Sequence, residues 1–334
     1  EHAICESIKK SSKIDKIFCF PGNAGTQKIA ENVEIDLTNF EIIKDFIIKN
    51  KIDLVIVGPE KPLVDGIVDY LEKYKIKVFG PNKISSQLEG SKIFTKQLCK
   101  KFNIPTAKFG VFKNKEQSKE FIKNSNFPIV IKADNLASGK GVYISNNLEE
   151  ANIAIDEIFN GKFGKAENLL VEEFLIGEGM GAYSPSRLIN EELKKKIINK
   201  IIQPTLKGLS DMGSQYLGFL YTGLMIIDNE PYLIEYNVRM GDPECQTILP
   251  KLNSDLFEII LACCEKRLAE AEIRWLDKKS LCIVVCSNGY PDKFKKNIEI
   301  EKIKKLKFNN NEFLFHAGTL ERNGKVFSIG GRVL

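Results

Sequence analysis

Short apolar runs alternate with amphipathic stretches along residues 1–80 of the chain. The apolar runs, each closed by glycine or proline, predict buried strands at Lys16–Phe20, Asp53–Val57 and Lys77–Phe79. The amphipathic stretches predict helices at Ala3–Lys10, Glu41–Lys49 and Val64–Tyr74. Strands and helices that alternate in this way form a doubly wound parallel sheet with helices on both faces. Because such a domain normally opens with a strand, we expect one strand to be missing ahead of Glu1.

The pattern changes after residue 90 and predicts a separate α+β region. Strands are expected at Lys108–Phe112, Ile129–Lys132, Val142–Ile144 and Leu169–Phe174. Helices are expected at Ser91–Phe102, Leu148–Phe159, Glu191–Leu209 and Asp255–Leu268, and Pro204 should bend or break the third of them. Phe219–Ile227 and Tyr232–Asn237 predict an antiparallel pair. A β-rich end follows, with a hairpin turn at Arg322–Lys325 because of its Asn-Gly pair.

These patterns indicate an α/β and α+β multidomain protein, and a chain of 334 residues usually holds two or three domains. We expect an N-terminal α/β substrate-binding domain over residues 1–90. A central domain should occupy residues 91–278, with a lid-like part over residues 107–178. A β-rich C-terminal domain should occupy residues 279–334.

Composition excludes several classes of protein. A net charge of +5 on 49 basic and 44 acidic residues is too small and too diffuse to predict nucleic-acid binding. The eight cysteines contain no C-x-x-C pair, and two histidines are too few for a histidine-rich zinc site or a Ser-His-Asp triad. No apolar run approaches 18 residues, so we expect no membrane-spanning helix. A monomer in the reducing cytoplasm is the expectation.

The segment Leu233–Glu244 carries the most informative side chains. On a strand, Glu235, Asn237 and Arg239 share one face, while Ile234 and its alternate neighbours share the other. A carboxylate, an amide oxygen and a guanidinium in a row suit Mg²⁺ beside a phosphate. Alternation alone also fits an amphipathic edge strand with solvated polar residues. The Gly-Asp-Pro-Glu turn that follows favours the metal interpretation, because it adds two carboxylates.

The glycine-rich segment Ile129–Val142 is like a phosphate loop but does not match the G-x-x-x-x-G-K-[ST] pattern. Lys132 on a buried strand and a flexible Gly-Lys-Gly between two strands would suit a lid over a triphosphate. A long hairpin without a ligand explains the pattern equally well.

Two further features are weaker. Leu169–Glu178 is a buried strand that runs into acidic residues, which suits an adenine edge and ribose hydroxyls but also fits an ordinary buried strand. The turns Gly22–Thr26, Gly58–Glu60 and Gly80–Pro81 follow strand carboxyl ends, where open α/β sheets bind ligands. Taken singly, each of these turns is more often structural.

Together, these segments resemble the glycinamide ribonucleotide synthetases, also called phosphoribosylamine–glycine ligases, of the ATP-grasp superfamily. The matching segments follow the family's order over nearly the whole chain: Glu1–Ala3, Pro21–Thr26, Val57–Glu60, Phe79–Pro81, Gln87–Lys92, Ile131–Val142, Val171–Leu175, Gly179–Pro185, Gly218–Leu224, Ile234–Glu244, His316–Thr319 and Gly330–Leu334. The resemblance implies an ATP-grasp core between the N-terminal and C-terminal domains.

The resemblance also implies an enzyme of purine biosynthesis. In this family the glycine carboxylate attacks the γ-phosphate of ATP, and ADP leaves. The amine of 5-phosphoribosylamine then displaces phosphate from glycyl phosphate, which gives glycinamide ribonucleotide. Such chemistry depends on charge neutralisation and positioning rather than on histidine. The implied co-substrate is ATP and the implied metal is Mg²⁺ or Mn²⁺, with no nucleic acid or membrane as partner.

Residue roles follow by position from the same resemblance. Lys92 and Lys132 should contact the phosphates of ATP, beneath a mobile loop formed by Gly139, Lys140 and Gly141. The adenine hinge and the ribose should be held by Glu172, Phe174, Leu175 and Glu178.

Catalysis and substrate binding are carried over in the same way. Glu235 and Asn237 should hold the metal, and Arg239 should act with Lys132 on the transferred phosphate. The phosphoribosylamine and glycine pocket should be bordered by Gly22, Asn23, Gly25, Thr26, Glu60, Gly241, Asp242, Pro243 and Glu244.

The chain departs from the family in three places. The leading strand and glycine-rich turn ahead of Glu1 are absent, and the chain stops at Leu334, short of the family's end. A segment of a few tens of residues that normally follows the hinge is also absent, because Gly179 follows Glu178 directly. We expect that residues are missing from the sequence there, since a true deletion would remove core strands.

Two other functions stay open at this point: another ATP-grasp carboxylate–amine ligase, and a non-catalytic nucleotide-binding module. The intact residues Lys92, Lys132, Glu235 and Asn237 argue against the second.

Overall fold

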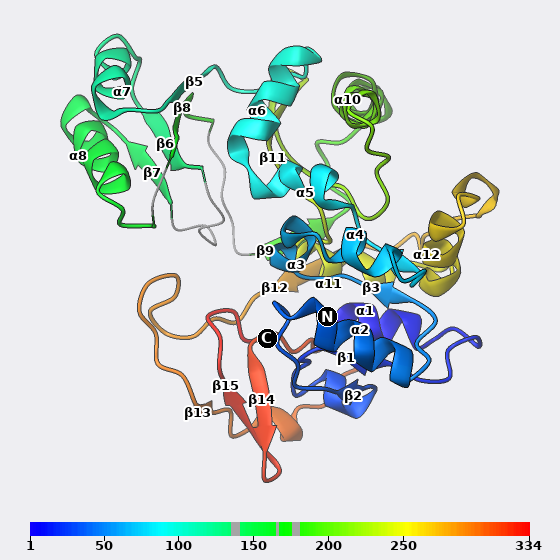
Figure 1. The fold of residues 1–334 in the computed structure, drawn as a ribbon. Coiled ribbons are helices and arrows are strands. Elements are labelled where there is room, and N and C mark those ends of the chain that lie inside the picture. Colours follow the sequence, from blue (N-terminus) through cyan, green and yellow to red (C-terminus); the bar gives the residue numbers. More distant parts are fainter. Residues whose placement is uncertain (135–140, 165–166, 176–180) are drawn as a thin grey trace. The chain divides into compact units, whose positions relative to one another are not determined.

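The computed structural model describes residues 1–134, 141–164, 167–175 and 181–334 (Figure 1). The chain forms two compact units. Unit 1 contains Glu1–Val55, Gly179–Ser186 and Gly241–Leu334, and unit 2 contains Ile56–Glu178 and Arg187–Met240. Over the described ranges, no helix combines the length and the apolar character that crossing a membrane requires.

Unit 1 begins with short α/β elements. Helix α1 (His2–Ile8) precedes strand β1 (Phe18–Cys19), which pairs in parallel with β2 (Glu31–Asn32). Helix α2 (Phe40–Lys49) begins at Asn39, whose side chain accepts a hydrogen bond from the Ile42 N–H, and it buries Ile43 and Ile47. Strand β3 (Val55–Ile56) lies at the boundary between the units. The parallel pairing agrees with the predicted α/β fold, but β2 was not among the predicted strands, and β1 and β3 are shorter than the predicted Lys16–Phe20 and Asp53–Val57.

The rest of unit 1 is mostly β-structure with short helices. Strand β9 (Gly181–Ser184) pairs antiparallel with β12 (Ser280–Ile283), and β15 (Lys325–Ser328) lies between β13 (Ile298–Glu299) and β14 (Thr319–Arg322). The predicted Asn-Gly hairpin is confirmed, because Asn323 and Gly324 take positive φ angles of 50° and 73° between β14 and β15. The helices of this part are α11 (Glu244–Ile248) and α12 (Leu256–Cys264), and the 3-10 turns of unit 1 are η1 (Thr26–Lys28), η3 (Leu249–Lys251), η4 (Leu268–Glu270) and η5 (Ile303–Lys305).

Unit 2 begins with two short helices where the sequence predicted one. The prediction of a single helix over Val64–Tyr74 is wrong: α3 (Glu60–Asp65) ends at Gly66, and α4 (Ile67–Glu72) starts after it. Gly66 takes a left-handed conformation with φ of +99°, which only glycine adopts without strain. Strand β4 (Val78–Phe79) follows, then α5 (Lys83–Gly90) and α6 (Lys92–Lys101).

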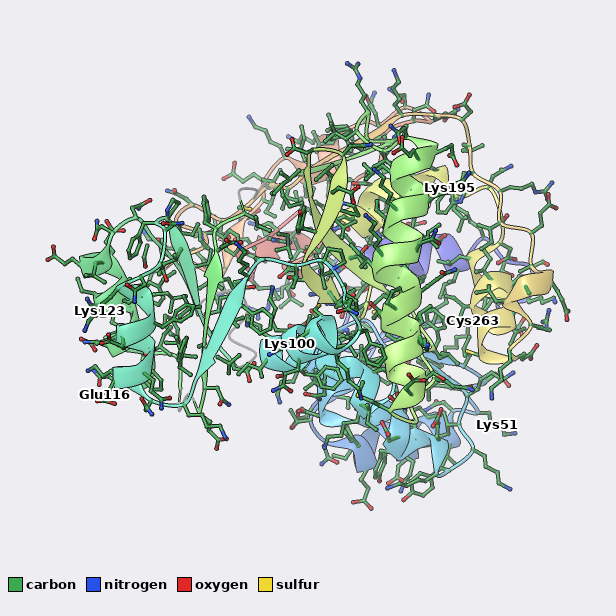
Figure 2. The ribbon with its side chains drawn as sticks, turned by 90° about the horizontal axis from the view of Figure 1, so that it is seen from above. Lys51, Lys100, Glu116, Lys123, Lys195 and Cys263 are labelled. Atoms are coloured by element: carbon green, nitrogen blue, oxygen red, sulfur yellow. The ribbon has the colours of Figure 1, made fainter. Side chains whose placement is uncertain are left out.

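A four-stranded antiparallel sheet forms the next part of unit 2. Its strands β5 (Phe109–Phe112), β6 (Ile129–Ala133), β7 (Val142–Ser145) and β8 (Leu169–Glu173) lie in the order β5-β8-β6-β7, and all four were predicted. Helices α7 (Lys115–Ile122) and α8 (Leu148–Phe159) cover one face of this sheet, and Glu116 and Lys123 mark α7 in Figure 2. The core between them contains Ile131, Ile155 and Leu169, all fully buried.

A long helix and a hairpin complete unit 2. Helix α9 (Glu191–Ile197) continues through a π-helical segment, η2 (Ile198–Ile202), into α10 (Gln203–Asp211), and Lys195 marks it in Figure 2. Pro204 was expected to bend or break this helix. It lies in the first turn of α10, directly after the π-helical segment. The irregularity expected from the proline is therefore a change from α-helical to π-helical hydrogen bonding just ahead of Pro204. Strands β10 (Tyr221–Ile227) and β11 (Glu230–Asn237) form the predicted antiparallel pair.

Candidate active site

The hairpin of β10 and β11 carries the predicted metal ligands. Its ladder pairs Gly223 with Glu235 and Leu224 with Leu233, which leaves Ile234 as an extra residue in a β-bulge. Because of the bulge, the consecutive residues Leu233 and Ile234 both line the same small cavity. The alternation inferred from the sequence did not foresee this local irregularity.

Beyond the bulge, β11 alternates as predicted. Tyr236 and Val238 are buried, whereas Glu235 is exposed and Asn237 is half-buried. Among the described residues, neither Glu235 nor Asn237 uses its side chain in a hydrogen bond or ion pair. One carboxylate and one amide oxygen fit Mg²⁺, which usually keeps several waters and takes other ligands from substrate phosphates. Within the same described ranges, no group of three or more Asp, Glu, His or Cys would hold a metal alone.

Lys92 is affected by charges both on β11 and on the neighbouring sheet. It is the first residue of α6, next to Ser91, whose hydroxyl donates to the Asp134 carboxylate at 3.2 Å. Burial lowers the pKa of Lys92, and the nearby Lys132 lowers it further, while Asp134 and Glu235 oppose the shift. Lys92 therefore lies within electrostatic reach both of the other predicted phosphate-binding lysine, Lys132, and of the predicted metal ligand Glu235.

Glu172 on β8 is buried between two lysines. Its Oε1 pairs with Lys96, and its Oε2 lies 2.5 Å from the Lys132 ammonium without the geometry of a hydrogen bond. Burial alone would raise the pKa of Glu172, but Lys132 and Lys96 together hold it below its usual range, so the carboxylate is ionised. Sequence reasoning missed Lys96, because its local pattern is like that of the neighbouring Lys100 and Lys101.

A cavity of about 30 Å³ opens beside this cluster, with room for one or two water molecules. Glu172 and Leu175, both predicted for the adenine hinge, line it, and Phe174 lies between them in sequence. A larger ligand enters only when lining side chains move. Its lining combines apolar and charged side chains: Ala107, Val130, Leu175, Leu233 and Ile234 with Lys96, Lys132, Glu172 and Glu173.

Most of the predicted lid loop lies outside the described residues. Gly139, Lys140 and the predicted ribose contact Glu178 belong to that part of the chain. Gly141 is described and buried, and its carbonyl accepts a hydrogen bond from the Ala133 N–H at 2.9 Å. Their roles in ATP binding stay predictions.

Arg239 is held by two carboxylates of unit 2. One terminal nitrogen of its guanidinium donates to Glu89 Oε1 at 2.8 Å, and its Nε lies 3.4 Å from Glu60 Oε2. The other oxygen of Glu89 accepts a hydrogen bond from the Val238 N–H at 2.8 Å. Glu89 therefore holds the Arg239 side chain against the backbone at the end of β11. Burial raises the pKa of Glu89, although Arg239 and the Val238 N–H act in the opposite direction. Glu89 is a second residue that sequence reasoning did not single out by itself.

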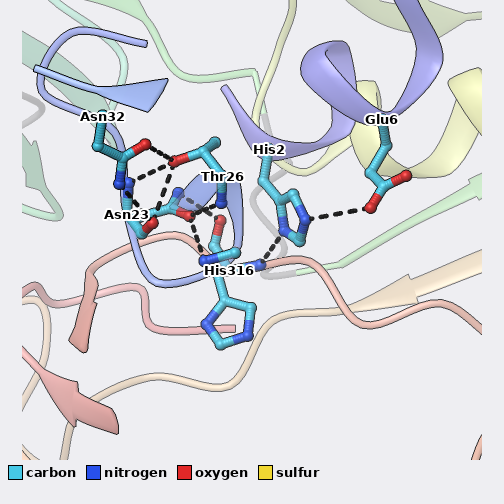
Figure 3. Close-up of polar contacts among 7 residues, drawn as sticks. His2, Glu6, Asn23, Thr26, Asn32 and His316 are labelled. Atoms are coloured by element: carbon cyan, nitrogen blue, oxygen red, sulfur yellow. Dashed lines mark hydrogen bonds and ion pairs between the residues drawn. The ribbon is translucent and has the colours of Figure 1, made fainter. Parts of the chain in front are cut away.

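The predicted substrate turn in unit 1 is built from internal hydrogen bonds (Figure 3). The side chain of Asn23 accepts from the N–H groups of Gly25 and Thr26, and its amide donates to the His316 carbonyl at 2.9 Å. The Thr26 hydroxyl contacts Asn32 at 2.7 Å. Gly22 takes a positive φ of 79°, which a turn of this shape requires. These contacts fix the turn, and its role in substrate binding stays a prediction.

His2 and His316 lie beside this turn and are both buried. Figure 3 shows the His316 N–H donating to His2 Nδ1, at 2.9 Å, which leaves the proton of the His2 ring on Nε2, toward Glu6. Burial lowers the pKa of each histidine to about 4, from an ordinary value of 6.5. The Thr319 hydroxyl contacts His316 Nδ1. The two rings therefore join the N-terminal and C-terminal segments of unit 1 in their neutral forms.

We expect unit 1 to lose stability as the pH falls from about 6.5 to about 4. In this window each histidine is protonated in the unfolded state but stays neutral in the folded state. The free energy of unfolding therefore falls by up to about 1.4 kcal/mol per histidine for each pH unit by which the pH is lowered. Urea unfolding at several pH values, followed by the single tryptophan Trp275, measures this slope. His2→Asn keeps an acceptor for the His316 N–H but cannot titrate, and it should show a shallower slope. An equal slope would contradict the assignment.

The predicted turn Gly241–Glu244 also lies in unit 1. A Cβ on Gly241 would meet Glu244 Oε2 at 2.2 Å, so glycine is required for the Glu244 side chain to fold back. Asp242 is held by Arg332, which contacts its carbonyl and lies 3.4 Å from Oδ2. Pro243 precedes α11. The predicted substrate residues thus divide between the units, because Glu60 belongs to unit 2.

Family models match the chain in three consecutive parts. The phosphoribosylglycinamide synthetase N domain matches residues 1–89, its ATP-grasp (A) domain matches residues 90–179 and 175–245, and its C domain matches residues 280–334. The two parts of the A-domain match meet at residues 175–179. Residues were expected to be missing from the sequence at this place, because Gly179 follows Glu178 directly.

Relatives and solved structures agree with these matches. A phosphoribosylamine–glycine ligase of Brucella melitensis is 39% identical over 370 positions, which is 36 more than the chain has residues, and the match covers 100% of this chain and 87% of the relative. The crystal structure of phosphoribosylamine–glycine ligase from Thermotoga maritima matches with a TM-score of 0.80 and 29% identity, over 99% of this chain and 88% of that one.

A more distant structure shows the same fold. The biotin carboxylase domain of a Hydrogenobacter thermophilus 2-oxoglutarate carboxylase, solved with ADP and magnesium, has a TM-score of 0.65 at 16% identity, over 99% of this chain and 84% of that one. The predicted multidomain α/β architecture with an ATP-grasp core is confirmed. On the three domain matches and the full-length relatives, this chain belongs to the phosphoribosylglycinamide synthetase family.

Proposed function

We propose that this chain joins glycine to 5-phosphoribosylamine at the expense of ATP, and releases glycinamide ribonucleotide, ADP and phosphate. The observation that carries the proposal is the gathering of Lys92, Lys132, Glu172 and Glu235 in one part of unit 2. The full-length match to ligases of this activity supports it. In finer detail, the enzyme acts as a cytoplasmic monomer with three domains, over residues 1–90, 91–278 and 279–334.

Nucleotide binding is assigned to residues of unit 2. Lys92 and Lys132 neutralise the phosphates of ATP, and Gly139, Lys140 and Gly141 close over them. The adenine lies in the cavity beside the hinge, and the side chains that line this cavity move to admit the base. The hinge and ribose contacts are Glu172, Phe174, Leu175 and Glu178.

Phosphoryl transfer is assigned to the hairpin end. Glu235 and Asn237 would hold Mg²⁺ or Mn²⁺, and the ion would neutralise negative charge on the phosphates. A glycine carboxylate oxygen attacks the γ-phosphorus, and the bond to ADP breaks. Arg239, fixed by Glu89, stabilises the charge on the transferred phosphate.

Amide formation follows. The amine of 5-phosphoribosylamine attacks the carbonyl carbon of glycyl phosphate, loses a proton, and phosphate leaves. The residues assigned to these two substrates are Gly22, Asn23, Gly25, Thr26, Glu60, Gly241, Asp242, Pro243 and Glu244. Holding the two reactants together in a productive geometry contributes to the acceleration of such a step.

The direct test is an ADP-release assay on the purified protein with ATP and Mg²⁺. We expect release only when glycine and 5-phosphoribosylamine are both present, with glycinamide ribonucleotide formed in equal amount. Omission of either substrate and replacement of glycine by other small acids are the controls. Release that is indifferent to phosphoribosylamine, or equally fast with another acid, would contradict the proposed substrates.

A further inference from the structure

Lys96 is a buried charge for which neither the sequence nor the proposed function gives a reason. It lies on α6, and its side chain is 3% exposed. Its ammonium contacts the Glu172 carboxylate and the Thr106 hydroxyl, and lies 5.7 Å from the centre of the Phe109 ring. Thr106 in turn donates to the Leu233 carbonyl at 2.7 Å. Lys96 thus links the helix, the hinge strand and the β11 strand.

Stability alone does not explain such a residue. Removing an ammonium and a carboxylate from water costs several kcal/mol per ion, and apolar residues of similar volume often replace buried ion pairs without loss. The surrounding side chains Ala107, Val130 and Leu233 would accept an apolar neighbour. A buried pair at the wall of a ligand cavity is better explained by what the ligand requires.

The cluster has one more cation than its carboxylate needs. Glu172 pairs with Lys96 through Oε1 and with Lys132 through Oε2. Lys132 is the more exposed of the two lysines, at 15% against 3%, and it lies on the strand that leads to the glycine-rich loop. A single lysine at Glu172 is enough to neutralise it, so one of the two can change partner.

We propose that Lys96 is a positioning residue of the nucleotide site: it remains the counter-ion of Glu172 when Lys132 leaves that carboxylate for the phosphates of ATP. The inference deepens the proposed function and rests on it. Without Lys96, Glu172 would retain Lys132, and ATP would have to compete with a buried carboxylate for the same ammonium. Lys96 acts through these two residues and needs no contact with the nucleotide.

The test is the affinity of the full chain for ATP, measured by calorimetry in Mg²⁺. Lys96→Met keeps the length of the side chain and removes its charge, and we expect the dissociation constant to rise about tenfold or more. Lys119→Met is the matched control: it also removes a lysine from an ion pair of unit 2, with Asp156, but away from the cavity. It should bind ATP like the wild type.

A double-mutant cycle separates positioning from packing. In Glu172→Gln there is no carboxylate to retain Lys132, so adding Lys96→Met should change the ATP affinity by less than about threefold. An equal loss in both backgrounds would mean that Lys96 acts through packing and would overturn the inference. If Lys96→Met alone does not fold, the inference is tested with the double variant, which removes both buried charges and so leaves neither of them unpaired. In that case, an affinity about tenfold or more below that of Glu172→Gln overturns the inference.

The pH dependence gives an independent readout. In Lys96→Met, Glu172 has no lysine partner once Lys132 moves to ATP, so ATP binding is coupled to protonation of the Glu172 carboxylate. The loss of ATP affinity relative to the wild type should therefore be smaller at pH 7 than at pH 9. Among the described residues, Lys92, Cys99 and Glu173 are further titratable groups near Glu172, and the ratio of variant to wild type removes their contribution. A deficit that does not depend on pH counts against the inference. If the wild type itself binds no ATP, it is the proposed function that fails.

Discussion

Replacing Glu235 with glutamine is expected to lower the turnover number by about a hundredfold or more, with the fold retained. Glu235 is exposed on β11, and among the described residues its carboxylate has no hydrogen bond to lose. The substitution keeps the shape of the side chain but removes the negative charge that holds the metal beside the phosphates. The measurement is the rate of ADP release at saturating substrates, together with the Mg²⁺ concentration that gives half of the maximal rate, which should rise.

Glu230→Gln is the matched control for this variant. Glu230 lies at the other end of β11 and pairs with Lys196 and Lys200 on the surface, so its loss should leave the turnover number within about twofold. Circular dichroism of both variants checks the fold. A turnover number of Glu235→Gln equal to that of the wild type would exclude the metal role.

Much of the fold follows from local patterns in the sequence. The four strands of the antiparallel sheet, the β10–β11 pair and the Asn-Gly hairpin were all predicted, because each depends on alternation and turn residues close together in the chain. Gly66 was not recognised as a helix end, since an isolated glycine within a helical pattern also occurs inside helices. The bulge at Ile234 was missed for a similar reason: a register shift depends on the partner strand.

The candidate site divides in the same way. Lys132 and Glu235 were recognised from their segments and Lys92 from the family resemblance, and in the structure Lys132 and Glu235 both lie within electrostatic reach of Lys92. Lys96 and Glu89 were not assigned roles, because what distinguishes them is a contact with a residue far along the chain. Glu89 bonds the Val238 N–H from 149 positions away, and nothing near Glu89 in the sequence indicates that partner. Local patterns identify residue types, whereas buried partners of this kind emerge only from the fold.

Arg239 is the residue for which such a partner matters most. Its guanidinium binds Glu89 through one nitrogen and the Met240 carbonyl through another, a geometry that a lysine cannot reproduce. Arg239→Lys is therefore expected to lower the turnover number by about a hundredfold to a thousandfold, because a misplaced charge stabilises the transferred phosphate poorly. The binding of ATP, measured separately, should change much less.

Glu89→Gln tests whether that loss comes from the position of the guanidinium. Glutamine carries no charge and has one acceptor oxygen, so it can accept from Arg239 or from the Val238 N–H but not from both as Glu89 does. We therefore expect a fall in turnover of about tenfold. Burial raises the pKa of Glu89 above its ordinary value, against the opposing effect of Arg239, and Glu60 raises it further. The wild type should therefore lose activity on the acid side as Glu89 takes up a proton, and Glu89→Gln should lack that acid limb because its side chain is already neutral. If both proteins show the same acid limb, Glu89 does not govern Arg239 through its charge, and the fixed guanidinium is explained by packing instead.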